Sequence, residues 1–327
     1  MLTGGSNTFG KLIDNNNNAA LTWYGRWVTN GDGKQSGWLG SYVKFKVKNT
    51  SNIRVFNTIS TTDTTSDLYQ SYYVDSIPNR MPQYTLYAGG AILAATTKYY
   101  DLPITNDGQW HELKIYGYAG TLARQIGQTG VVVINSFQLD AGGQIAQSTI
   151  GAKRVQVIGD SWMGASVNWT RRLDNASYDV YPIAANGITC SVANTNYNLD
   201  FTGITNTTDP NCDAVIISYG VNDFNASVTT GAFQTALLAL VDKVRLKQPT
   251  AKIFLLRVPS NTVASKAYGQ YGANMSTIAG LRSNVVYLDT TSLDATTTWD
   301  SDTGHLSANS VIDFESWIET QLIANGI

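Results

Sequence analysis

The chain has 327 residues, which is long enough for two domains that each bury a core of their own. Its formal net charge is −2, only 14% of its residues are charged, and it has no run of Lys or Arg. This balance argues against nucleic acid or an anionic membrane surface as the main partner, and it favours a neutral ligand.

A hydrophobic period of two residues runs through the chain up to about residue 145. In 41–49, apolar side chains alternate with lysines, which predicts a half-buried strand with the lysines on the face opposite the core. The same period predicts strands over 52–60, 82–90, 110–118 and 130–140. Because turn residues separate these segments and no amphipathic helix pattern occurs among them, we expect residues 1–145 to form an antiparallel β-sandwich of the jelly-roll kind.

The pattern changes after residue 150. Short apolar runs at 154–160, 212–220, 251–259 and 284–290 are typical of strands covered on both faces in a parallel sheet. Helical spacing of apolar residues predicts a helix over 232–249 that Pro249 ends, and a C-terminal helix with Ser307 or Asn309 as its N-cap. Residues 151–327 are therefore expected to form a three-layer α/β domain, with the domain boundary inside 139–154.

The cysteine and histidine inventory limits the chemistry. Cys190 and Cys212 are the only cysteines, and one disulfide or two buried free thiols are both open at this point. His111 and His305 are the only histidines, and they lie far apart along the chain. Since no zinc-ligand spacing and no phosphate-binding glycine loop occurs, we expect no metal, no nucleotide cofactor and no metal-dependent deacetylase activity.

Polar residues follow two of the predicted parallel strands at the point where each ends. Asp160 and Ser161 come directly after one apolar run, and Asn222 follows the next strong one. The carboxyl ends of parallel strands gather functional groups at one edge of a sheet. The ordinary alternatives are that Asp160 and Ser161 cap a helix and that Asn222 makes an Asx turn. Between these two segments, Gly187 can bring a bare backbone N–H to the same edge, although a glycine in a loop is most often just a turn residue.

His305 is the candidate catalytic histidine. It lies in a polar loop before the C-terminal helix, and Asp302 lies three residues earlier, close enough to orient an imidazole from the same turn. The ordinary alternative is a surface histidine. His111 belongs to a predicted strand of the first half, where it is expected to pack or to face solvent.

Taken together, Gly159-Asp160-Ser161, Gly187, Gly220-x-Asn222-Asp223 and Asp302-x-x-His305 resemble the ordered motif blocks of the SGNH (GDSL-type) hydrolase superfamily, over residues 154–327. The resemblance implies Ser161 as the nucleophile, His305 as the base and Asp302 as the acid that orients it. It also implies an oxyanion hole made of the Ser161 N–H, the Gly187 N–H and the Asn222 side chain. Asp160 is expected to hold the loop and not to act as the acid.

The upstream strands followed by these blocks resemble carbohydrate esterase family two and the esterase modules of bacteriophage tail spikes. This resemblance implies a secreted or virion-associated enzyme that removes O-acetyl groups from a polysaccharide or oligosaccharide, with the sandwich domain contacting the carbohydrate. A non-catalytic glycan-binding or phage receptor-binding module and a lipid or thioester hydrolase are the alternatives. Trp162, which stands where the family usually has a small aliphatic residue, is expected either to narrow the acyl pocket or to pack in the core. The segment 1–13 has no signal-peptide pattern, no stretch is apolar enough to span a membrane, and the oligomeric state stays open.

Overall fold

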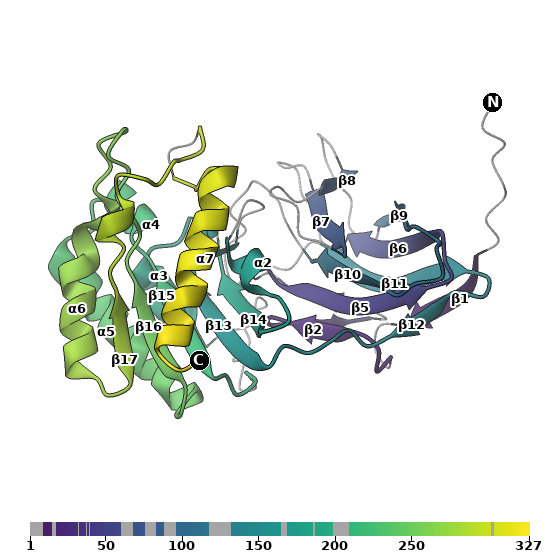
Figure 1. Ribbon diagram of the computed structural model, residues 1–327, viewed down its shortest axis with the longest axis horizontal. Coiled ribbons are helices and arrows are strands. Elements are labelled where there is room, and N and C mark those ends of the chain that lie inside the picture. The colour runs from purple at the N-terminus through teal and green to yellow at the C-terminus, as the bar shows by residue number, and fades with distance from the viewer. Residues whose placement is uncertain are drawn as a thin grey trace. The chain divides into compact units, whose positions relative to one another are not determined.

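In the computed structural model the chain divides into two compact units, the first lying before residue 150 and the second having Ile150–Ile327 as its body (Figure 1). The residues that the structure describes are 9–14, 18–31, 33–36, 38, 40–59, 68–75, 83–87, 96–117, 132–164, 169–185, 187–198, 209–301 and 304–327.

In its described residues, the first unit has two antiparallel sheets of six strands each. One sheet has the order β3-β4-β11-β6-β9, with β1 also paired to β11, and the other has the order β12-β5-β10-β7-β8, with β2 also paired to β5. The strands of the first sheet are β1 (Phe9–Asp14), β3 (Val28–Asn30), β4 (Gly33–Gln35), β6 (Asn52–Ile59), β9 (Thr96–Pro103) and β11 (Val132–Asp140). Those of the second are β2 (Thr22–Tyr24), β5 (Tyr42–Lys48), β7 (Leu68–Val74), β8 (Gln83–Tyr87), β10 (His111–Tyr116) and β12 (Gln144–Ala146).

Alternating apolar side chains of both sheets share one buried core. Val43, Phe45 and Val47 of β5 pack there with residues of β6, β10 and β11, including Ile53 and Phe137. The five strands predicted in this half are confirmed as β5, β6, β8, β10 and β11. The two sheets therefore confirm an antiparallel all-β unit, whereas its jelly-roll connectivity stays a prediction.

The three lysines of β5 lie on the face opposite this core, as predicted, but that face is not open to solvent at Lys44. Lys44 is only 2% exposed, and its ammonium lies 5.8 Å from the centre of the Tyr24 ring. Tyr24 belongs to a second buried cluster with Tyr42, Tyr73 and Tyr116. Aromatic rings attract a cation through their faces, and the lysine stem adds apolar contact area, so an alternating lysine did not mark a solvated position.

The second unit is built on a parallel sheet of five strands in the order β14-β13-β15-β16-β17. The strands are β13 (Lys153–Gly159), β14 (Tyr178–Ala184), β15 (Ala214–Ser218), β16 (Lys252–Leu256) and β17 (Val285–Leu288). Four of them confirm the predicted apolar runs. The sequence pattern missed β14, because Pro182 interrupts its apolar run and proline has no N–H for a sheet ladder. A strand that contains proline is tolerated at the edge of a sheet, and β14 is an edge strand of the parallel sheet.

Helices cover both faces of this sheet and complete three layers. On one face, α1 (Ser161–Gly164), α2 (Trp169–Leu173) and α7 (Ala308–Ala324) pack in one core with Val155, Val157 and Ile216. The next residue along each strand points the other way, and Ile158, Val215 and Ile217 are buried on the second face. On that side α3 (Cys190–Asn196), α5 (Thr230–Lys247) and α6 (Gly272–Leu281) contact one another in sequence order.

The two predicted helices are confirmed as α5 and α7. Gln248 is the C-cap of α5, directly before Pro249, and Ser307 rather than Asn309 is the N-cap of α7. The remaining helix, α4 (Val221–Asn225), follows β15, and short 3-10 turns occupy Tyr268–Tyr271 and Thr291–Leu293. No helix in the described part of the chain is long and apolar enough to cross a membrane.

Of the two alternatives for the cysteines, the structure has free thiols. Cys190 and Cys212 are both buried and unbridged. Burial raises the pKa of Cys212 to about 12 and that of Cys190 well above its usual value, so both are protonated and act as small apolar side chains.

Candidate active site

The site lies where the strand order of the parallel sheet reverses. The chain leaves β13 for β14 on one side of it and then returns for β15 on the other side. In a sheet of this kind, the crevice for a ligand opens at the carboxyl ends of the strands that flank the reversal. Gly159, the last residue of β13, is in register with Ala184 of β14 and Ser218 of β15. Ser161, Gly187 and Asn222 follow within a few residues, so all three reach the same edge.

Gly159 permits the sharp exit that delivers Ser161. A Cβ at this position would lie 2.2 Å from Met163 Cγ and 2.7 Å from the Ser218 carbonyl oxygen, which no side chain can accommodate. The chain turns at once into α1, of which Ser161 is the first residue, and the Met163 N–H donates to the Asp160 carbonyl at 3.0 Å. Glycine is thus required here by close packing.

Asp160 connects its own motif to the motif that contains Asn222. Its carboxylate is 1% exposed, and it accepts a hydrogen bond from the Trp162 N–H at 2.9 Å and one from Asn222 Nδ2 at 2.8 Å. Burial raises the pKa of Asp160 to about 6, although these two bonds and the nearby His305 oppose that rise. These contacts match the expectation that Asp160 holds the loop.

Asn222 is oriented by this contact and remains able to make another. It lies in α4, whose N-cap Gly220 has a φ of 145°, a backbone conformation that favours glycine. A carboxamide nitrogen carries two hydrogens, and Asp160 takes only one of them. The bond to Asp160 therefore leaves the second amide hydrogen unused.

The neighbouring Asp223 has a different partner. Its carboxylate oxygens accept from the Cys190 N–H at 3.1 and 3.2 Å, at the first residue of α3. Burial raises the pKa of Asp223 to about 7, and the nearby charge of Asp160 adds to the rise. Asp223 therefore anchors α4 to α3.

His305 is presented by a short antiparallel hairpin that leads into α7. The Asp300 N–H donates to the His305 carbonyl at 2.8 Å, and Trp299 forms a β-bridge with Leu306. The Nε2 atom of His305 lies 2.8 Å from Ser161 Oγ, although the two residues are 144 positions apart in the sequence. The structure therefore brings together the predicted nucleophile and base. Asp302 lies outside the described residues, so its part as the orienting acid stays a prediction.

Two further residues singled out in the sequence have clear surroundings. Gly187 follows β14 with a φ of 70° and is exposed, so a left-handed backbone position accounts for the glycine. Its part in an oxyanion hole stays a prediction. Trp162 is 3% exposed and packs edge-to-face on Phe314 with a 5.0 Å centroid separation, and it also contacts Trp169. Of its two expected roles, the structure supports the core position.

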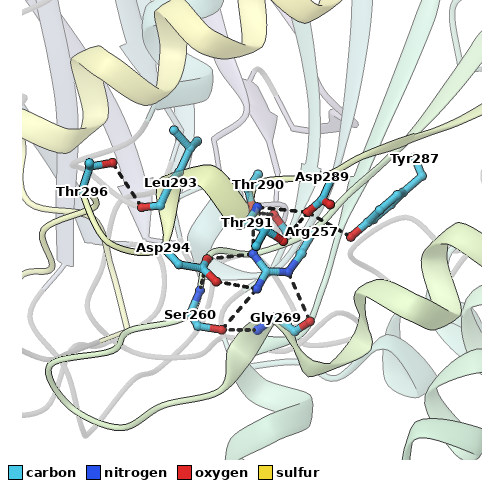
Figure 2. Close-up of polar contacts among 10 residues, drawn as sticks. All are labelled: Arg257, Ser260, Gly269, Tyr287, Asp289, Thr290, Thr291, Leu293, Asp294 and Thr296. Carbon is cyan, nitrogen blue, oxygen red and sulfur yellow. Dashed lines mark hydrogen bonds and ion pairs between the residues drawn. The ribbon is translucent and has the colours of Figure 1, made fainter.

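An interaction that sequence reasoning missed joins the loops after β16 and β17. Arg257 makes a two-pronged ion pair with Asp294, at 2.7 Å for each nitrogen–oxygen contact, and also donates to Thr290 Oγ1 at 3.1 Å (Figure 2). Asp294 lies on the path from β17 to the His305 hairpin. Arg257 and Asp294 are 37 residues apart in the chain, so no local sequence pattern indicates that they pair.

The fold and site define a class of protein. A serine hydroxyl hydrogen-bonded to an imidazole, beside amide donors at the carboxyl edge of an α/β sheet, is the arrangement of hydrolases that use a serine nucleophile. Residues 149–309 match the family model of the GDSL-like Lipase/Acylhydrolase family, and this part of the chain is a domain of that family. Among curated proteins, no significant match to the sequence is found.

Solved structures extend the likeness to nearly the whole chain. A family two carbohydrate esterase from Clostridium thermocellum, in complex with cellohexaose, is 17% identical with a TM-score of 0.70, and the match covers 93% of this chain and 98% of that one. The family two esterase from Cellvibrio japonicus is 14% identical over 95% and 96% of the two chains, with a TM-score of 0.71. An acetyl xylan esterase from Butyrivibrio proteoclasticus is 13% identical over 97% and 98%, with a TM-score of 0.67. At these identities the likeness establishes a common fold, including the β unit that precedes the hydrolase domain.

Proposed function

We propose that this protein is a serine esterase that removes O-acetyl groups from carbohydrate through an acyl-enzyme. The observation that carries the proposal is the 2.8 Å contact between Ser161 Oγ and His305 Nε2 at the carboxyl edge of the parallel sheet. This contact supplies a nucleophile and a base in hydrogen-bond reach of each other, which is the first requirement for acyl transfer.

In the first half of the reaction, neutral His305 takes the proton of Ser161 as the serine oxygen attacks the ester carbonyl. The bond from the carbonyl carbon to the sugar oxygen of the tetrahedral intermediate then breaks, and the imidazolium returns the proton to this oxygen, so that the sugar leaves with a free hydroxyl. Asp302 is proposed to orient the imidazole and to stabilise its positive charge. The nearby carboxylate of Asp160, when ionised, adds to this stabilisation.

The negative oxygen of the intermediate is proposed to accept hydrogen bonds from the Ser161 N–H, the Gly187 N–H and Asn222 Nδ2. These donors meet a charge that develops only in the transition state, so each is expected to contribute about 3 kcal/mol, or roughly 10² to 10³ in turnover. The bond from Asn222 to Asp160 fixes the carboxamide before substrate arrives. A donor that is already oriented avoids the cost of reorganisation during the reaction.

In the second half, water replaces the sugar as the attacking group. His305 deprotonates this water, a second tetrahedral intermediate forms, and acetate leaves as Ser161 regains its proton. No cofactor is needed for either half, because the serine, the imidazole and the amide donors supply all of the chemistry.

Carbohydrate is the proposed alcohol part of the ester. The nearly full-length likeness to two family two carbohydrate esterases and an acetyl xylan esterase, sandwich unit included, supports this choice. The C. thermocellum enzyme is described in complex with cellohexaose. Residues 1–145 are proposed to contact the glycan, and residues 151–327 to perform catalysis. An extracellular or virion-associated location stays a prediction.

The test measures acetate release from acetylated polysaccharides, together with the hydrolysis of p-nitrophenyl esters from acetate to decanoate. The proposal expects acetate release and a preference for the shortest acyl chain, with both lost in a folded Ser161→Ala protein. A preference for long chains would favour a lipid hydrolase of the same fold. Glycan binding with no turnover of any ester would favour a binding module instead.

A further inference from the structure

A cavity that the proposed chemistry does not use lies next to the Asn222 helix. It has a volume of ≈ 500 Å³ and is lined by Phe224, Asn225, Ser227, Val228, Lys266 and Gln270. Phe224 and Asn225 share the five-residue helix α4 with Asn222, so the cavity begins within one helical turn of the proposed oxyanion donor. It therefore lies on the same edge of the sheet as Ser161.

A row of aromatic rings connects the cavity to the hairpin that carries His305. The Phe224 ring meets Tyr268 edge-on with a centroid separation of 5.4 Å, and Tyr268 lies 5.5 Å from Trp299. Trp299 in turn bridges to Leu306, the residue after His305. Packed aromatic side chains thus link the cavity to the hairpin that carries the proposed base, which suits a subsite beside the serine.

Lys266 gives the cavity its charge. Its ammonium lies 5.9 Å from the centre of the Phe224 ring, and within the described part of the chain no carboxylate pairs with it. This is unlike Arg257 and Arg282, which are paired to Asp294 and Asp242. A cation with no counter-ion in a concave polar site attracts an anionic ligand group. The Asn225 carboxamide and the Ser227 hydroxyl add groups that can bind sugar hydroxyls.

The wall of the cavity is held in place before any ligand binds. The Lys266 N–H donates to the Asn261 carbonyl at 2.8 Å, and the Asn261 N–H donates back at 2.9 Å. Farther along this loop, Gly269 accepts from Arg257 Nε at 3.3 Å and donates to Ser260 Oγ at 3.2 Å (Figure 2). A preorganised loop loses little conformational freedom on binding, which is what a specific subsite requires.

We propose that this cavity is a subsite for a carboxylate-bearing sugar of the glycan, with Lys266 pairing with the sugar carboxylate. The inference rests on the proposed esterase function and narrows its substrate class to acidic acetylated polysaccharides. Uronic acid polymers have this chemistry.

The kinetic test uses acetylated polygalacturonate and the same polymer after methyl esterification of its carboxylates, with acetate release as the readout. We expect a higher kcat/KM on the anionic polymer. In Lys266→Gln, the ratio of the two kcat/KM values should fall by about tenfold, mainly through KM, and high salt should reduce the wild-type ratio in the same way. Equal losses on both polymers would overturn the carboxylate assignment.

The matched control is Lys153→Gln, which removes the same charge at the amino end of β13, the opposite edge of the sheet. The Lys153 side chain is 44% exposed and makes only a 3.4 Å contact with Asp213, so its replacement should leave the ratio of the two kcat/KM values unchanged.

A binding measurement separates failure of the subsite from failure of the esterase proposal. Calorimetric titration of Ser161→Ala with trigalacturonate, and with its methyl ester, should show binding that weakens by about tenfold when Lys266→Gln is added. If esters are hydrolysed but this binding does not depend on Lys266, the subsite is wrong and the esterase stands. If the binding depends on Lys266 but no ester is hydrolysed, the subsite stands and the esterase is wrong.

Discussion

The two histidines of the chain lie in the two units and have contrasting surroundings. In the β unit, His111 is 8% exposed, and both of its ring nitrogens face carboxylates, Nδ1 at 2.6 Å from Asp75 and Nε2 at 3.0 Å from Asp107. In the α/β unit, Nε2 of His305 faces a serine hydroxyl. Carboxylates on both sides stabilise a charged imidazole and leave it no nitrogen for chemistry, whereas an imidazole beside a serine hydroxyl can act as a base when it is neutral. The same residue type is thus structural in one unit and a candidate catalyst in the other.

The largest expected effect comes from replacing each histidine in turn. His305→Gln should lower kcat on p-nitrophenyl acetate by roughly 10⁴ or more, because no base remains to activate Ser161. His111→Gln is the matched control and should leave kcat within about twofold, since both ring nitrogens of His111 are already bound by carboxylates of its own unit. Comparable losses of kcat in the two variants would contradict the different roles assigned to His111 and His305.

The next largest effect is expected at Asp160. Asp160→Asn places one carboxamide against another and releases Asn222, so kcat should fall by about 10² to 10³, the usual effect of one lost oxyanion donor. A double-mutant cycle with Asn222→Ala provides the check. The two losses should be far from additive if Asp160 acts through Asn222.

The pH dependence of kcat/KM provides a second test of the role of Asp160. The pKa of Asp160 is raised to about 6, so the ionised form is lost as the pH falls below that value. Wild-type kcat/KM should therefore decrease as the pH falls through about 6 and Asp160 is protonated. Asp160→Asn cannot gain this proton, so the decrease that belongs to Asp160 should be absent from its profile. Acid profiles of the same shape in the wild type and in Asp160→Asn would contradict this assignment.

A smaller effect is expected from the ion pair between Arg257 and Asp294. Asp294→Asn should lower the free energy of unfolding by about 3 kcal/mol, because it leaves the guanidinium, whose side chain is 9% exposed, without its partner. Arg282 and Asp242 form the control, with the same two-pronged geometry but side chains that are 38% and 50% exposed. Asp242→Asn should cost less than about 1 kcal/mol. Chemical denaturation of both variants measures the difference.

The smallest effect is the pH dependence of the β unit. Hydrogen bonding to Asp75 is the main reason that the pKa of His111 is raised, and the bond to Asp107 adds to it. Because the folded pKa exceeds the unfolded value of about 6.5, the stabilisation is complete below that pH and disappears as the pH rises through the folded pKa. His111→Gln should therefore lower Tm by a few degrees at pH 5.5 and by less at pH 9. Equal shifts at both pH values would show that packing, and not charge, explains His111.

The sequence was informative where local pattern and local chemistry agree. Period-two and buried apolar runs placed nine of the strands, and the polar residues after β13 and β15 marked the edge that carries Ser161 and Asn222. The missed features depend on distant partners. Nothing near Asp160 in the chain signals its bond to Asn222, 62 residues away, and nothing near Lys44 signals that its ammonium lies against the ring of Tyr24. Pairing between side chains that are distant in the sequence depends on how the chain packs in three dimensions. The periodicity of hydrophobic residues along the sequence carries no information about such packing.

The proline at the rim of the parallel sheet has a consequence for how copies of this protein meet. A bare strand edge invites an identical chain to extend the sheet, which is a common start of aggregation. Pro182 interrupts the row of hydrogen-bond donors along β14, in a strand that has the parallel sheet on one side only. The residue that hid this strand from pattern analysis thus also leaves its outer side with one donor fewer for an added strand.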